Sequence, residues 1–109
     1  MTIAEALDAE AAARDGVERR NVGGEVEWAA GGVTFAGAAG DTAEFRLSPV
    51  VADAARDTPD AGPSDRGGEW VAFSPPELDR YALDRAIAWF GSAYRTAAPA
   101  TGQESKRPR

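Results

Sequence analysis

Apolar and polar residues alternate with a period of two along three stretches in the first half of the chain. The stretches are residues 25–28, 33–35 and 43–47. In the last of them, Ala43, Phe45 and Leu47 share one side and the charged residues between them share the other. This alternation is typical of a strand with one buried and one solvated face. Gly-Gly and Gly-Asp pairs separate the stretches, so we expect an antiparallel three-stranded meander joined by tight turns.

The pattern then changes to that of helices with one more strand between them. Ser-Pro pairs open residues 48–57 and 74–97, and serine at the N-cap followed by proline favours a helix start. Residues 69–73 alternate again and predict a fourth strand. Near the N-terminus, Thr2 and Glu5 have the spacing of a capping box, which predicts a first helix. Its apolar face is small, so we expect this helix to be loosely held or to depend on a partner.

These elements follow the order α-β-β-β-α-β-α, which predicts an α+β fold with a four-stranded antiparallel sheet and helices packed on one face. The expected domain covers residues 24–98, after an N-terminal helix and linker at 1–23 and before a disordered polar tail at 99–109. The segment 58–68 is rich in Pro, Gly and Asp and is expected to be a loop. We expect an aromatic core of Trp28, Phe35, Phe45, Phe73, Trp89 and Phe90.

This arrangement resembles the MmcQ/YjbR-like proteins, which are small domains with a double-wing, CyaY-like layout. The stretches that match are Phe45-Arg46-Leu47, Ser48-Pro49, residues 69–73 and Ala93-Tyr94-Arg95. The resemblance covers about residues 25–98 and rests on aromatic residues and strand ends, with no catalytic signature. It implies a possible link to DNA, because that family has been associated with DNA binding.

The chain of 109 residues contains no Cys and no His. This excludes disulfides, metal sites built from thiolate or imidazole, thiol nucleophiles and every catalytic triad that depends on histidine. We therefore expect a protein that is not an enzyme and that holds no cofactor or metal. No apolar run approaches the roughly 20 residues of a membrane span, and no basic segment followed by an apolar one begins the chain. We expect a cytoplasmic protein.

Eighteen acidic residues against twelve basic ones give a formal net charge of −6. An acidic protein repels phosphate groups, so nucleic-acid binding is disfavoured. Lysine occurs once and arginine eleven times among the basic residues. Adaptation to high salt and a GC-rich genome both explain this composition, and the composition does not distinguish them.

The last predicted helix carries an apolar arc wider than one packing surface requires. Leu83, Ile87 and Tyr94 form a line beside the residues expected to face the core. Either the first helix or a second copy of the chain must cover this line, and we expect a homodimer or a protein partner there. Trp70 is expected on the outer face of the sheet, either as an interaction residue or covered by a neighbouring loop or the first helix.

Charged residues on the outer face and in the predicted loop form a second candidate site. The alternation places Glu25, Glu27, Glu44 and Arg46 on the outer face. Asp60, Asp65 and Arg66 are candidates for binding a ligand from the 58–68 loop, although that loop lacks the spacing of a calcium site. The leading hypothesis is a non-enzymatic module that binds a protein partner or itself. The alternative is a small-ligand-binding domain that uses the sheet and this loop, and nucleic-acid binding ranks last.

Overall fold

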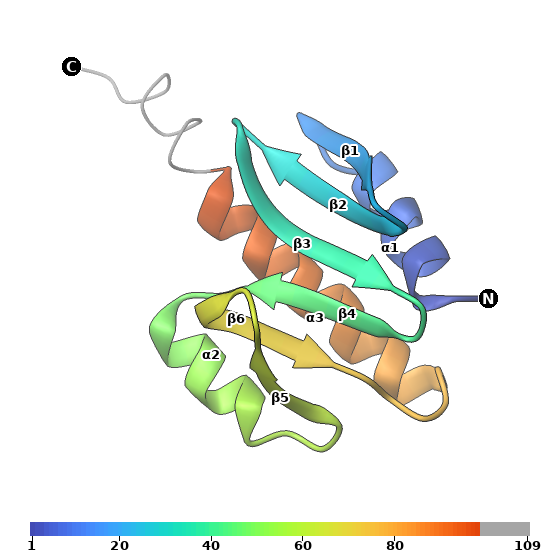
Figure 1. Cartoon of the computed structure of the whole chain (residues 1–109), viewed down its shortest axis with the longest axis vertical. Coiled ribbons are helices and arrows are strands. Elements are labelled where there is room, and N and C mark those ends of the chain that lie inside the picture. The colour runs from blue at the N-terminus through green and yellow to red at the C-terminus, as the bar shows by residue number, and fades with distance from the viewer. Residues whose placement is uncertain (99–109) are drawn as a thin grey trace.

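The computed structural model describes residues 1–98 and shows an α+β fold in which three helices accompany one open antiparallel sheet (Figure 1). The helices are α1 (Ile3–Ala12), α2 (Pro49–Arg56) and α3 (Arg80–Ala97). The strands are β1 (Val17–Val22), β2 (Glu25–Ala30), β3 (Val33–Ala39), β4 (Thr42–Arg46), β5 (Ala61–Ser64) and β6 (Gly67–Phe73). Their order across the sheet is β1-β2-β3-β4-β6-β5. The tail expected at 99–109 lies outside the described residues.

The prediction of an α+β fold with an antiparallel sheet is confirmed, but the prediction of four strands is wrong. The sheet has six strands, because β1 and β5 are additional strands at its two edges. The element order is therefore α-β-β-β-β-α-β-β-α. β1 joins β2 through Gly23 and Gly24, which both have positive φ, as a two-residue hairpin turn requires. β5 lies within the segment expected to be a loop, and its Pro63 is tolerated because edge strands need fewer backbone donors.

The core lies between the sheet and the helices, and we call the sheet face that lines it the inner face. Five of the six aromatic residues expected there are fully buried, namely Trp28, Phe35, Phe45, Phe73 and Phe90. The sixth, Trp89, is partly buried and packs edge-on against Phe73, with ring centroids 5.2 Å apart. Alanines fill the space between these rings, so a few large side chains form a continuous core.

The helix starts agree with the predicted caps at two of three places. The capping box of Thr2 and Glu5 is present at α1. Ser48 is the N-cap residue before Pro49 at α2, although its side chain makes no capping hydrogen bond. The long helix α3 begins later than predicted, because Asp79 caps it with a carboxylate that accepts a hydrogen bond from the Ala82 backbone N–H at 2.9 Å. The Ser-Pro pair at residue 74 therefore does not start this helix.

The first helix is an integral part of the core, contrary to the expectation that it is loosely held. Leu7 is fully buried and Ile3 nearly so. The carboxylate of Asp8 accepts hydrogen bonds from Trp28 Nε1 at 3.0 Å and from Arg19 Nε at 2.9 Å, which ties α1 to β2 and β1. Ile3, Leu7 and the smaller Ala6 thus dock this helix together with its polar contacts.

Candidate functional site

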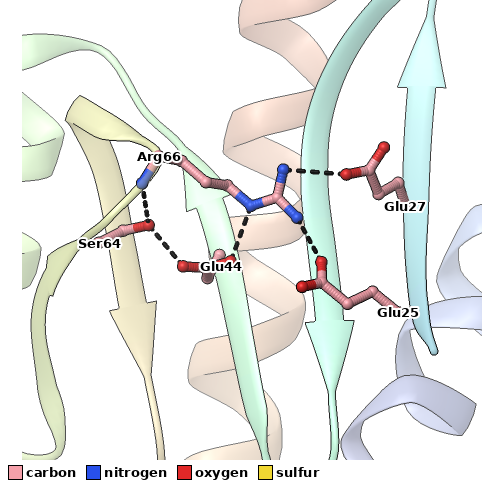
Figure 2. A network of polar contacts seen from close by, with 5 residues as sticks. All are labelled: Glu25, Glu27, Glu44, Ser64 and Arg66. Carbon is pink, nitrogen blue, oxygen red and sulfur yellow. Dashed lines mark hydrogen bonds and ion pairs between the residues drawn. The ribbon is translucent and has the colours of Figure 1, made fainter. Parts of the chain in front are cut away.

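The face of the sheet opposite α1 and α3, which we call the outer face, carries a polar network centred on Arg66 (Figure 2). Three carboxylates surround the Arg66 guanidinium, and they come from β2 and β4. Nε donates to Glu44 Oε1 at 2.7 Å, and Nη1 donates to Glu27 Oε2 at 3.0 Å. Nη2 donates to Glu25 Oε1 at 2.7 Å. The side chain therefore crosses β4 and β3 to reach β2.

A glycine in β3 makes room for this crossing. The strand register places Gly37 directly between Glu27 of β2 and Glu44 of β4. A Cβ atom at Gly37 would lie 2.9 Å from Arg66 Nη2, closer than real Cβ contacts allow. The Arg66 guanidinium thus lies against bare backbone, where a side chain on β3 would displace it.

The hairpin between β5 and β6 carries Arg66 at its tip. The register between the two strands breaks after Pro63, so Ser64 pairs with Gly67 and the tip departs from the regular ladder. The Ser64 hydroxyl accepts a hydrogen bond from the Arg66 backbone N–H at 3.1 Å and donates to the Glu44 carboxylate. These two contacts orient the tip so that the Arg66 side chain extends over the sheet, as Figure 2 shows.

Charge in the network is unbalanced, because three carboxylates face one guanidinium and leave two formal negative charges. Burial lowers the pKa of Arg66, but hydrogen bonds and charge interactions with Glu44 and Glu27 outweigh this and raise the pKa above its usual value. The guanidinium is therefore a permanent cation. The Glu27 side chain is 17% exposed and the Glu25 side chain 43%, so Glu25 is the more accessible partner.

An open pocket of about 400 Å³ lies beside the network on the outer face. It is lined by Val22, Glu25, Glu27, Glu44, Asp65 and Arg66. Four of these six side chains are acidic and one is basic, so the pocket attracts cations and disfavours anions. Its size is sufficient for a small group such as a guanidinium or an amine.

Trp70 lies on the outer face next to the network. Its register partner in β4 is Arg46, and the Arg66 Cζ atom is 5.0 Å from the centre of the indole ring. An arginine over an indole face at this distance forms a cation–π contact. Trp70 is partly buried, and Arg66 and Gly67 of the hairpin tip lie against its ring.

The structure brings some of the predicted site residues together and separates others. Asp65, Arg66 and Trp70 lie with the predicted outer-face carboxylates in one network or its pocket. Asp60 is apart from them, at a positive φ of 69° in the turn before β5, where its backbone oxygen accepts from the Ser74 N–H at 2.9 Å. Sequence reasoning found the carboxylates from their alternation, but it had no signal for Arg66 as their partner.

The line of Leu83, Ile87 and Tyr94 on α3 is half-buried. α1 packs along α3, and the Tyr94 hydroxyl donates to the Asp15 backbone oxygen at 2.8 Å. The Arg14 guanidinium lies 5.8 Å from the Tyr94 ring centre. The first helix and the turn after it thus contact the Tyr94 end of the line, which was one of the two alternatives for its cover.

Two kinds of site are absent from residues 1–98. No group of His, Cys, Asp or Glu side chains in this part of the chain is arranged to hold a metal ion. None of its helices has the length and apolar character needed to cross a membrane.

The chain matches no protein-family model and no curated protein sequence. The fold and the outer face define it as an α+β protein with an open six-stranded sheet and an acidic, arginine-centred network.

Proposed function

We propose that the protein is a non-enzymatic interaction module whose outer face binds a guanidinium or ammonium group of a partner. The observation that carries this proposal is the Arg66 guanidinium, held by three carboxylates and placed over Trp70. The face already has the groups that bind such a cation, and it has more negative charge than Arg66 neutralises. The lack of His and Cys in the sequence supports binding rather than catalysis.

Charge supports a basic partner. Two formal negative charges remain in the network, and Asp65 lines the same pocket. The whole chain has a formal net charge of −6, so a basic segment is attracted over a longer distance as well. The same field repels phosphates, which argues against the nucleic-acid role implied by the resemblance to MmcQ/YjbR-like proteins. Membership of that family stays a prediction.

The position of Glu25 supports entry of a cation from solvent. Its side chain is the most exposed of the three carboxylates and lies at the rim of the pocket. Glu27 and Glu44 are more buried and hold Arg66 in place. A partner's arginine or lysine is therefore expected to bind first to Glu25 and Asp65, next to the side chain that already occupies the inner part of the network.

The pocket also favours a second candidate, a small-ligand-binding domain for a free cationic metabolite. Its volume of about 400 Å³ is within the range of small-molecule sites. The segment 58–68, which supplies Asp65 and Arg66, is the predicted ligand loop in this alternative. Both candidates share the chemistry of a guanidinium or ammonium group, and only the carrier of that group differs.

Isothermal titration calorimetry on the full chain distinguishes a cationic group on a protein partner from one on a free metabolite. The probes are an arginine-rich peptide, agmatine, an acidic peptide of equal length and a short DNA duplex. We expect the arginine-rich peptide to bind, with an affinity that falls as salt is added. Glu25→Gln is expected to weaken binding about tenfold, since a hydrogen bond to a charged group contributes roughly 1.5 kcal/mol. Glu77→Gln, a matched change at an exposed site before α3, should have no effect.

The outcomes separate the hypotheses. If agmatine binds as tightly as the arginine-rich peptide, the protein-partner proposal is wrong and the small-ligand alternative replaces it. If Glu77→Gln weakens binding as much as Glu25→Gln does, the overall negative charge of the protein, and not a site on the outer face, is responsible for binding. If neither cationic probe binds at low salt, the proposed function is wrong.

A further inference from the structure

The two edges of the sheet differ in how they are protected. β5 has four residues, contains Pro63 and loses its regular register beside it, and α2 packs against it. β1 has six residues, no proline and an unbroken register with β2, and every residue after Val17 is exposed. Natural proteins usually shorten, break, cover or place charges on a strand edge because its free backbone groups pair readily with another strand. The charges of β1 therefore allow only a strand with complementary charges to pair with it. β1 has the regular form that accepts a further strand.

Symmetry limits the ways in which a second copy can pair with β1. A two-fold axis perpendicular to the sheet keeps the two outer faces on one side, so residues directly opposite each other must share a face. Antiparallel pairing is then centred on a residue. Arg20 lies opposite Glu27 of β2 and so belongs to the outer face, as does Glu18 two residues before it.

Charge selects one of these registers. Pairing centred on Arg19 places Glu18 opposite Arg20 of the second copy, and the symmetry repeats this contact. Pairing centred on Glu18 or on Arg20 also places two like charges opposite each other but forms no Glu18–Arg20 contact, so only the Arg19-centred register offsets its one like-charge pair with two opposite-charge contacts. Within one copy, Arg20 Nη2 and Glu18 Oε1 are 3.8 Å apart and both side chains are well exposed, so both are available for contacts across the edge.

The opposite side of β1 is compatible with the same register. On the inner face, where Arg19 lies opposite Trp28 of β2, Arg19 would face Arg19 of the second copy. Its guanidinium already has a partner in each copy, because Arg19 Nε donates to the Asp8 carboxylate of α1 at 2.9 Å. The repulsion between the two arginines is thus reduced by a neighbouring carboxylate in each copy.

We propose that two copies of this chain pair through β1, antiparallel and centred on Arg19, with two reciprocal Glu18–Arg20 contacts. The sheet then continues from one copy into the other, and the two outer faces lie on the same side of it. This interface is separate from the line of Leu83, Ile87 and Tyr94 on α3. It adjoins the cation site, because Val22 of β1 lines that pocket, but the Glu18–Arg20 contacts use other side chains of the strand.

Light scattering on the full chain at high concentration tests the pairing. The parent is expected to have twice the chain mass of 11.4 kDa. Glu18→Arg and Arg20→Glu each place like charges at both contacts, so each variant alone is expected to be a monomer. An equimolar mixture of the two variants places opposite charges at both contacts and is expected to restore the dimer. Matched controls are Glu77→Arg and Arg80→Glu, at exposed sites before and at the start of α3.

Circular dichroism melts show whether each variant is folded, and the restored mixture would exclude misfolding as the cause of dissociation. A monomeric parent overturns the proposal. The proposal is also wrong if the dimer persists in both β1 variants but dissociates in Ile87→Glu. That result would place the interface on α3. Variants that dissociate without recovery in the mixture contradict the Arg19-centred register.

Discussion

The inner and outer faces of this sheet are held by different forces. The inner face contacts α1 and α3 through fully buried rings such as Phe35 and Phe90, whose centroids are 5.2 Å apart. Within residues 1–98 no helix lies over the Arg66 network of the outer face, and charged hydrogen bonds of 2.7 to 3.0 Å hold this network together (Figure 2). Burial of apolar surface dominates stability, whereas a half-exposed ion network contributes less because water competes for its groups.

On each side of the sheet a glycine makes room for an arginine side chain. Gly37 on the outer face lies under Arg66, and Gly91 on α3 lies under Arg14. The Arg66 guanidinium is held by three carboxylates, while Arg14 has one carboxylate partner, Glu10, together with the Phe90 and Tyr94 rings. A glycine beneath an arginine therefore has two roles. It allows Arg66 to order the polar outer face, and it allows Arg14 to hold the end of α1 against α3.

The largest expected effect comes from the inner face. Phe90→Ala removes a ring that packs on both Trp28 and Phe35. The free energy of unfolding should fall by about 3–5 kcal/mol, as for buried aromatic residues in general. Urea denaturation measures this change. A loss smaller than that of the next variant would reverse the order of the two faces.

Arg66→Met should lower the free energy of unfolding by about 1–3 kcal/mol, because three carboxylates lose a charged hydrogen-bond partner. The effect should shrink in 1 M salt, where the remaining carboxylates repel one another less. Arg80→Met at an exposed site is the matched control and is expected to change stability by less than about 0.5 kcal/mol. An unfolding curve of Arg66→Met that equals this control would show that the network does not stabilise the fold.

Gly37→Ala should destabilise by about 0.5–1.5 kcal/mol, since the added methyl group forces the Arg66 guanidinium away from at least one carboxylate. The test is a double-mutant cycle with Arg66→Met. In that background the clash is absent, so the alanine should be neutral or slightly stabilising. Equal losses in both backgrounds would mean that Gly37 is required for a reason other than Arg66.

Gly91→Ala should have the smallest effect. Replacing glycine inside a helix gains up to about 1 kcal/mol, and the displaced Arg14 side chain gives back part of this gain. We expect a net change of less than about 0.5 kcal/mol, measured by thermal melting. In an Arg14→Ala background most of the gain should appear, since only Arg95 Nη1, 3.3 Å from the added Cβ, still has to move. A large loss in the parent would indicate that Arg14 cannot move and that its contact with α3 is rigid.

Local patterns in the sequence predicted the central part of the fold. The period-two alternation identified β2, β3, β4 and β6, because a strand with one buried face repeats its apolar side chains at every second residue. It also placed Glu25, Glu27 and Glu44 together on the outer face. The two edge strands escaped this reasoning: β1 is exposed at five of six positions and β5 contains glycine and proline, so neither carries the pattern.

The sequence by itself determined the strands with a buried side, the caps of α1 and α2, and the absence of chemistry that needs His or Cys. Only the tertiary structure decided where Arg66 binds and how α1 docks. The partners of Arg66 lie 22, 39 and 41 residues away along the chain, and no local spacing encodes such contacts. Arg66 reaches them because the β5–β6 hairpin folds its tip over the sheet and because Gly37 leaves the backbone of β3 bare.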